Sequence, residues 1–187
     1  MDYDAFSHGQ IISKIWLAEE LERHLQPNPI IWVLGSWYSL TSFILLVRKP
    51  DFYKCIIGYD ANPNNLDIAD KVCSAWNIYN PIQAKNIVAD ANNLNWDNPP
   101  DAVINTSAEH FENTVWFDHI PKNTIVCIQS TNITTINSPW YVKQPTPTVK
   151  DFISQYPLAV KLMLGIKNIP LNKHGKSYER YMIIGKK

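Results

Sequence analysis

Short apolar runs alternate with helical segments along most of this chain, and this alternation constrains the fold more than any other feature. The predicted strands cover residues 30–34, 55–59, 86–89, 102–105, 124–129, about 159–167 and 178–185. The predicted helices cover residues 10–25, 37–48, 63–76 (with Asn64 or Asn65 as the cap), about 110–118 and 148–156 (opened by Thr148). Such alternation indicates a mostly parallel sheet with helices on both faces.

The last two strands have no helix between them, and their connection, residues 168–176, contains Pro170 and Gly175 and suits a hairpin-like return. We therefore predict an α/β fold, a three-layer αβα sandwich whose sheet of about seven strands carries an antiparallel C-terminal pair. A length of 187 residues suits one domain, here residues 1–187. Residues 1–29 are expected to form a helical segment that packs on the core.

Composition excludes several classes of function. The formal net charge is zero, which does not suit a protein held on nucleic acid by bulk charge. Residues 1–10 lack the basic start and apolar stretch of a signal peptide, and no apolar run reaches the length of a membrane span. Cys55, Cys73 and Cys127 match no zinc spacing, so we expect free thiols, no metal site and a cytoplasmic location.

The predicted strands end in residues that suit a ligand site. In open parallel sheets, ligands bind outside the carboxyl ends of the strands, here at Gly35, Asp60, Asp90, Asn105 and Gln129. Gly35 allows close approach to the backbone, or only a turn. Asp60 follows Gly35 by about 25 residues and suits ribose hydroxyls, or caps a helix. Asp90 suits an adenine amino group, or is an ordinary loop residue.

The most polar strand end is residues 105–110, NTSAEH. Glu109 and His110 suit acid and base roles, because histidine titrates near neutrality and burial raises carboxyl pKa values. The alternative is a helix cap at Thr106 or Ser107, with Glu109 or His110 in the first turn. The polar residues 129–132 suit the far side of a pocket or a plain loop.

These pieces resemble the class I (Rossmann-like) S-adenosylmethionine-dependent methyltransferases, most of all the small forms met in phages and marine bacteria. The resemblance covers nearly the whole chain and is carried by residues 10–17, 34–38, 58–63, 90–92, 103–111 and 178–187. It implies a Rossmann-like fold, S-adenosyl-L-methionine as cofactor and methyl transfer as the reaction.

The resemblance also implies roles for individual residues. Gly35, Ser36 and Trp37 would lie against the methionine part of the cofactor, and Asp60 would bind its ribose. The remaining cofactor-binding residues that it implies are Asp90 and Ala91 at the adenine edge, Asn105 and Thr106 near the sulfonium, Lys14 and Ser13 toward the carboxylate, and Ala61, Asn92 and Ser107 beside them.

Some residues depart from the family pattern. Trp37 and Tyr38 stand where small residues are usual, and residues 30–34 lack the usual acidic residue. Residues 105–108, NTSA, differ from the Asn/Asp-Pro-Pro-Tyr/Phe pattern of enzymes that methylate base amino groups. No cysteine follows the fourth strand, which argues against the cysteine route to pyrimidine carbon-5.

The resulting expectation is a methyltransferase that acts on a small-molecule or undefined acceptor, with His110 as the first candidate base and Glu109 as the second. Four aromatic residues could wall the acceptor pocket or pack in the core: Trp37, Tyr38, Trp140 and Tyr141. The alternatives are a protein that binds the cofactor without methyl transfer, and an enzyme that cleaves the cofactor or transfers its aminocarboxypropyl group. A nicotinamide-dependent oxidoreductase fits less well, because the chain lacks a second half-sheet.

Overall fold

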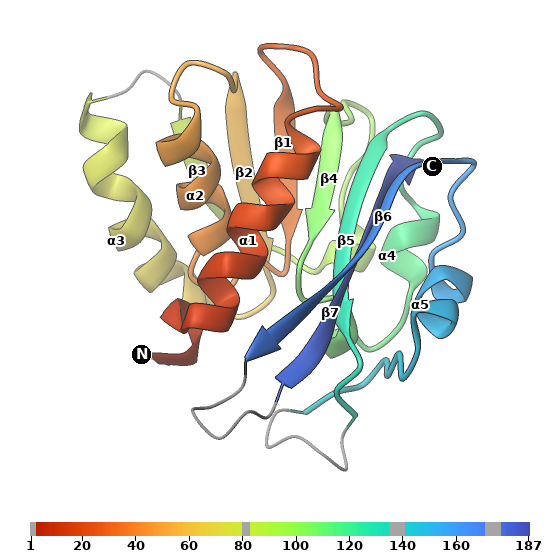
Figure 1. Ribbon diagram of the computed structural model, residues 1–187. Helices are drawn as coiled ribbons and strands as arrows, with labels where there is room; N and C mark the ends of the chain where they lie inside the picture. Colours follow the sequence, from red (N-terminus) through yellow and green to blue (C-terminus); the bar gives the residue numbers. More distant parts are fainter. Residues whose placement is uncertain (1–2, 80–82, 135–140, 171–176) are drawn as a thin grey trace.

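Seven strands form a single mixed sheet in the computed structural model, which describes residues 3–79, 83–134, 141–170 and 177–187 (Figure 1). The sheet order is β3-β2-β1-β4-β5-β7-β6. The strands are β1 (Ile30–Leu34), β2 (Cys55–Asp60), β3 (Gln83–Val88), β4 (Ala102–Asn105), β5 (Ile125–Thr131), β6 (Val160–Pro170) and β7 (Ser177–Lys186). β1 to β5 pair in parallel, whereas β7 is antiparallel to both β5 and β6. The predicted mostly parallel sheet with an antiparallel C-terminal pair is confirmed.

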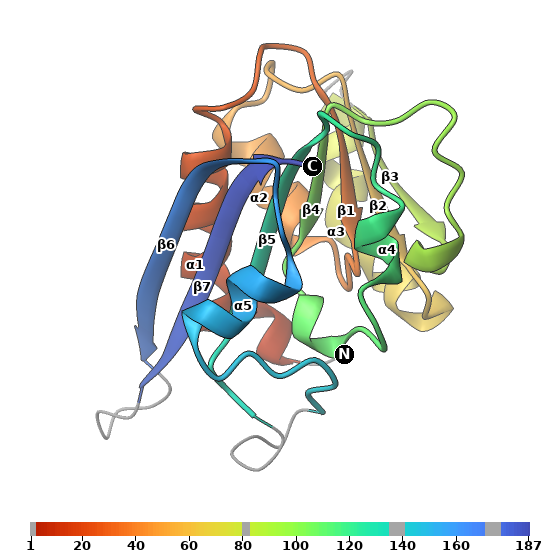
Figure 2. The same cartoon turned by 90° about the vertical axis from the view of Figure 1, so that its right-hand side faces the viewer.

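Helices cover both faces of this sheet, as the two ribbon views show (Figures 1 and 2). One face carries α1 (His8–Leu21), α2 (Leu40–Arg48) and α3 (Pro63–Tyr79), and the other carries α4 (Val115–Asp118) and α5 (Val149–Gln155). Three short 3-10 helices complete the described elements: η1 (Tyr3–Phe6), η2 (Ala91–Asn93) and η3 (Ala108–His110). The predicted three-layer αβα arrangement is confirmed.

The two faces of the sheet bury separate hydrophobic clusters. Val33 and Ile184 belong to the cluster under α1 and α2, whereas their neighbours Leu34 and Ile183 belong to the cluster under α4 and α5. Successive side chains of a strand point to opposite faces, so a central strand covered on both sides must be apolar throughout. This explains why β1 reads as an unbroken apolar run.

Some predicted boundaries shift. α1 begins at His8 and is capped by Ser7, whose side chain accepts from the backbone nitrogen of Gln10. It ends at Leu21 rather than near residue 25. The helix expected over 37–48 begins only at Leu40, because Trp37 and Ser39 adopt positive φ angles of 50° and 57°. The segment expected as one helix near 110–118 is divided into η3 and α4.

The caps of two helices show where local sequence is and is not sufficient. The prediction of Asn64 or Asn65 as the cap of α3 is wrong: the helix begins at Pro63, and Asn62 Oδ1 accepts from the backbone nitrogen of Asn64 at 3.0 Å. Proline suits the first helical position, which moves the cap to Asn62. The cap of α5 at Thr148 is confirmed, and Asp151 completes a capping box with it.

Within the part of the chain that the structure describes, no helix has the length and apolar character needed to cross a bilayer. The described residues also contain no cluster of three or more histidine, cysteine, aspartate or glutamate side chains that could hold a metal ion. In the described part of the chain, Cys55, Cys73 and Cys127 form no disulfide bond.

Gly185 in β7 gives a prediction about stability. A Cβ atom at this position would lie 2.1 Å from the backbone oxygen of Val160 in β6, and a backbone atom held in a sheet has little room to move. We expect Gly185→Ala to lower the free energy of unfolding by about 3 kcal/mol or more, measured by urea denaturation. Lys186→Ala removes the neighbouring exposed side chain and should change it by less than about 0.5 kcal/mol. A Gly185→Ala loss below about 1 kcal/mol would contradict the predicted backbone clash.

Candidate active site

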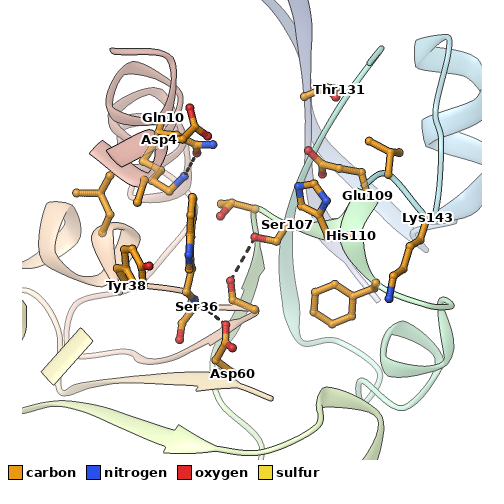
Figure 3. A pocket seen from close by; sticks show the side chains of 18 of the residues that line it. Asp4, Gln10, Ser36, Tyr38, Asp60, Ser107, Glu109, His110, Thr131 and Lys143 are labelled. Atoms are coloured by element: carbon orange, nitrogen blue, oxygen red, sulfur yellow. Dashed lines mark hydrogen bonds between the residues drawn. The ribbon is translucent and has the colours of Figure 1, made fainter. Parts of the chain in front are cut away.

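A cavity of about 670 Å³ lies at the carboxyl ends of the parallel strands, between the N-terminal helical segment and the loops that follow β1, β2, β3 and β4. This volume is within the usual range for pockets that bind small molecules. Figure 3 shows its two walls and base by residue: Gln10, Asp4 and Tyr38 on one side, Glu109, His110 and Lys143 on the other, and Ser36 and Asp60 below.

Gly35 forms a tight turn at the end of β1. Its φ angle is +61°, and an added Cβ atom would lie 2.9 Å from the ring of Phe111. Ser107 Oγ donates to the carbonyl oxygen of Gly35 at 3.2 Å, so the loops after β1 and β4 are joined at this point. Glycine is therefore needed here both for its backbone conformation and for its lack of a side chain.

Asp60, at the end of β2, organises the same region. Its Oδ2 accepts from the backbone nitrogen of Trp37 at 2.8 Å, and its Oδ1 accepts from the backbone nitrogen of Asn62 at 2.9 Å and Nδ2 of Asn65 at 3.1 Å. A carboxylate offers about four acceptor positions. Asp60 therefore fixes the turn after β1 and retains acceptor capacity toward the cavity that it lines.

Asp90 caps a short turn rather than a long helix. Its Oδ1 accepts from the backbone nitrogen of Asn92 at 2.9 Å at the start of η2. Ala91 is buried, and His119 Nδ1 lies 3.1 Å from the carbonyl oxygen of Asn92. These contacts hold the segment 90–92 against the cavity as a fixed edge.

Of the residues at the end of β4, one is buried behind the cavity wall and two line the cavity. Asn105 is fully buried and is not part of the cavity wall; its Oδ1 accepts from the backbone nitrogen of Ser107 at 2.9 Å. Thr106 and Ser107 do line the cavity. Ser107 precedes η3 without a side-chain capping bond, because its hydroxyl donates to Gly35 instead.

His110 and Glu109 point to different surroundings. His110 is exposed and lines the cavity, and its Nδ1 lies 2.9 Å from the carbonyl oxygen of Tyr141. Glu109 is 4% exposed and pairs with Arg180, whose Nη1 donates to Glu109 Oε1 at 3.3 Å. The Glu109 carbonyl oxygen also accepts from the backbone nitrogens of Lys143 and Gln144, at 2.8 and 3.0 Å.

Lys14 reaches the cavity from α1. Its side chain is buried, and Nζ donates to Gln10 Oε1 at 2.5 Å. Burial lowers the pKa of Lys14 to about 7, and the nearby Arg180 charge acts in the same direction, although Glu109 and Asp4 oppose it. Ser13, predicted beside it, is fully buried, is not part of the cavity wall and donates to the backbone oxygen of Gln10.

Comparisons with known proteins bear on this arrangement. No family model matches the chain, and no curated protein matches its sequence. The solved structure of YcgJ from Bacillus subtilis matches with a TM-score of 0.67 and 13% identity, over 97% of this chain and 99% of that one. Coclaurine N-methyltransferase bound to N-methylheliamine and SAH matches with a TM-score of 0.67 and 9% identity, over 95% of this chain and 73% of that one. The chain has the class I methyltransferase fold.

TehB from Haemophilus influenzae shares this methyltransferase fold with a TM-score of 0.65 and 14% identity, over 90% of this chain. This chain spans 61% of the TehB length. Solved structures of an rRNA methylase from Streptococcus thermophilus and a precorrin-6y C5,15-methyltransferase from Geobacter metallireducens also match, with TM-scores of 0.58 and 0.56. The named acceptors of these neighbours differ, so the shared fold does not identify an acceptor.

Most of the residues predicted to bind the cofactor line the cavity, and so do both candidate bases. The cofactor-binding candidates that do so are Lys14, Gly35, Ser36, Trp37, Asp60, Ala61, Asp90, Ala91, Asn92, Thr106 and Ser107, and the candidate bases are Glu109 and His110. The predicted roles of these residues stay predictions. Asn105, also predicted to bind the cofactor, is buried outside the cavity wall and accepts from the backbone nitrogen of Ser107.

The sequence interpretation missed Arg180, Gln10 and Tyr178, which also line the cavity. Arg180 precedes the buried run 181–185 of β7 and Lys186 follows it, so the sequence offers two basic residues beside this run without showing which one is buried. Of the predicted aromatic wall residues, Trp37 and Tyr38 line the cavity, Tyr141 is 73% exposed and contributes its carbonyl to His110, and Trp140 lies outside the described residues.

Proposed function

We propose that this protein is an S-adenosylmethionine-dependent methyltransferase that acts on a small-molecule acceptor. One observation carries the proposal: a single cavity at the carboxyl ends of the strands contains the Gly35 turn, the acidic residues after β2 and β3, and His110. Ligands of open α/β sheets bind in this position.

The residues present fit the cofactor. Asp60 combines near-complete burial with free acceptor capacity, which suits ribose hydroxyls. Ser36 Oγ is buried without a hydrogen-bond partner among the described residues, and it lies beside the glycine turn where a polar ligand would complete it. Asp90, Ala91 and Asn92 would hold the adenine edge. When bound, the cofactor supplies a methyl group already activated by a sulfonium.

His110 is suited to remove a proton from the acceptor. A carbonyl oxygen can only accept, so the bond to Tyr141 requires the proton on Nδ1 and leaves the Nε2 lone pair free. An acceptor hydroxyl or ammonium within reach of Nε2 would transfer its proton there as the new bond to carbon forms. His110 thus acts as the proposed general base.

Glu109 has a different proposed part in this mechanism. Its carboxylate is held by Arg180, and its backbone oxygen binds the segment that supplies the Tyr141 carbonyl. Glu109 therefore positions the base, and as a second base it would first have to leave a buried ion pair.

Isothermal titration calorimetry with S-adenosylmethionine and SAH tests the proposal. We expect both to bind in the micromolar range. We also expect turnover of S-adenosylmethionine when pools of small alcohols, amines and carboxylic acids are added. Mass analysis of the cofactor products separates methyl transfer from cofactor cleavage or aminocarboxypropyl transfer. Absence of binding at high micromolar concentration would remove the proposal.

A second candidate is a protein that binds the cofactor without transferring its methyl group. Trp37 favours it, because this bulky side chain lines the cavity beside the glycine turn and packs against Tyr38 at a centroid distance of 5.2 Å. Cofactor binding without turnover across broad acceptor pools would support this candidate.

Trp37→Ala tests whether this ring is a wall or a plug. We expect SAH binding to weaken by about threefold to tenfold in calorimetry, because the ring forms part of the cavity wall and an aromatic contact contributes about 0.5–1.5 kcal/mol. The matched control Trp76→Ala removes a tryptophan that packs against the hydrophobic cluster under α1 and α2, outside the cavity, and should leave the affinity unchanged. Tighter SAH binding by Trp37→Ala would instead identify Trp37 as a plug.

A further inference from the structure

The cavity has two halves that different strands build. Asp60 and Asp90 follow β2 and β3, on one side of β1, whereas Glu109 follows β4 and Arg180 belongs to β7, on the other side. β7 is three strands from β1, and strands lie about 4.8 Å apart, so β7 is roughly 14 Å across the sheet from β1 and its Gly35 turn. Arg180 is therefore on the side away from the proposed nucleoside site.

Arg180 is a buried cation with unused hydrogen-bonding capacity. It is 3% exposed, and its guanidinium lies 5.8 Å from the ring centroid of Tyr178. Its Nε and the Oε2 atom of its partner Glu109 have no hydrogen-bond partner among the described residues. A buried ion pair with unsatisfied atoms is unfavourable unless another group completes it.

Lys14 of α1 brings a second basic group to this half. Its charge interacts with those of Arg180 in β7, Glu109 in η3 and Asp4 in η1. Because its pKa is lowered to about 7, Lys14 is uncharged in a large fraction of the molecules at neutral pH. The buried set Lys14, Glu109 and Arg180 then has a net charge near zero. A bound monoanion would be balanced by one proton added to Lys14.

We propose that Arg180, with Lys14 beside it, binds a carboxylate of the methyl acceptor, so that the acceptor is a small organic acid. In this proposal Lys14 faces the acceptor carboxylate in place of the cofactor carboxylate expected from the resemblance. This inference rests on the proposed methyltransferase function and names its substrate class. The planar guanidinium matches the geometry of a carboxylate. A doubly charged phosphate fits less well, because its second charge would face Glu109 and Asp4. Phe111, Ile133 and Val142 line the same cavity and suit an apolar body for the acid.

Acid–amide pairs test this subsite directly. Propionate, phenylacetate and benzoate are titrated into the protein saturated with SAH, and the neutral amide of each serves as its control. Saturating SAH fills any site for the carboxylate of the cofactor itself. We expect at least one acid to bind about tenfold or more tightly than its amide, since a hydrogen bond to a charged group contributes about 1.5–3 kcal/mol.

Arg180→Gln should abolish the preference for acids while leaving SAH affinity within about twofold. Lys167→Gln is the matched control, because Lys167 is the cross-strand neighbour of Arg180 in β6 but is not part of the cavity wall. It removes the same charge and should leave the preference intact. If Arg180→Gln does not fold, the double variant Glu109→Gln/Arg180→Gln is used in its place, because it removes both charges of the ion pair and leaves no unpaired charge buried.

Proton uptake supplies a measurement that needs no variant. Titration of the acid in buffers of different ionisation enthalpy should show uptake close to one proton at pH 8, where Lys14 is mostly uncharged before binding, and much less at pH 6, where it is already charged. Lys14→Met should remove this uptake.

Three results would overturn the inference. Acids and amides that bind alike, or that both fail to bind, show that no carboxylate subsite exists. If Arg180→Gln weakens SAH but not 5′-methylthioadenosine, which lacks the amino-acid end, the carboxylate belongs to the cofactor. If neither SAH nor the acids depend on Arg180, the residue is structural. Failure of SAH to bind would instead count against the proposed function, and the acid titration without SAH then tests the subsite alone.

Discussion

Asp60→Ala is expected to weaken SAH binding by about 30-fold or more, measured by calorimetry. The carboxylate is the proposed acceptor for the ribose hydroxyls, and one hydrogen bond to a charged group contributes about 1.5–3 kcal/mol. The same change releases the backbone nitrogens of Trp37 and Asn62, so the turn after β1 and the start of α3 also lose their shared anchor. Both effects act in the same direction on affinity.

Two further variants separate these contributions. Asp60→Asn keeps an acceptor oxygen for the backbone and should fall between the native protein and Asp60→Ala. Asp67→Ala removes an exposed carboxylate of α3 outside the main cavity and should leave affinity unchanged. An Asp60→Ala protein that is folded by circular dichroism and binds SAH within twofold of the native protein would refute the ribose assignment.

His110→Ala is expected to lower the rate of methyl transfer by roughly 100- to 10,000-fold, the range usual for loss of a general base. SAH affinity should stay within about twofold, because His110 is placed on the acceptor side of the site. The measurement is turnover of labelled cofactor with the acceptor found in the pool experiment.

The control for this variant is His24→Ala, which removes a histidine near the far end of α1 that is not part of the cavity wall. Its rate should equal that of the native protein. A His110→Ala enzyme that retains full activity would exclude His110 as the base and return attention to Glu109.

The sequence was sufficient for the features that depend on local pattern. β1 and β4 were predicted at their observed bounds, because central strands buried on both faces must be continuously apolar. Asp60 was predicted at this edge because an acidic residue at the carboxyl end of a parallel strand falls where ligands of open sheets bind, and it does line the cavity. The Thr148 cap was predicted from the residue that opens the helical segment, and Asp151 three residues later completes a capping box that was not predicted.

The features that escaped prediction depend on contacts between distant segments. α2 starts late because the backbone nitrogen of Trp37 is held by Asp60, more than 20 residues away in the chain. Lys14 was predicted to reach the cofactor carboxylate, but its lowered pKa was not predicted, because it comes from burial and from the charge of Arg180 in a distant strand. No local pattern pairs residue 109 with residue 180, since η3 and β7 meet only through the sheet order.

The segment that begins at Tyr141 both contacts His110 and lines the cavity through Val142 and Lys143. The carbonyl of Tyr141 keeps the proton on Nδ1 of His110. The backbone nitrogens of Lys143 and Gln144 donate to the carbonyl oxygen of Glu109. A molecule that shifts this short stretch on its way into the cavity would also free the imidazole ring to rotate or change tautomer. In the proposed mechanism the same piece of main chain lines the cavity and orients the base, so substitutions there should alter which acceptors react before they alter how tightly the nucleoside binds.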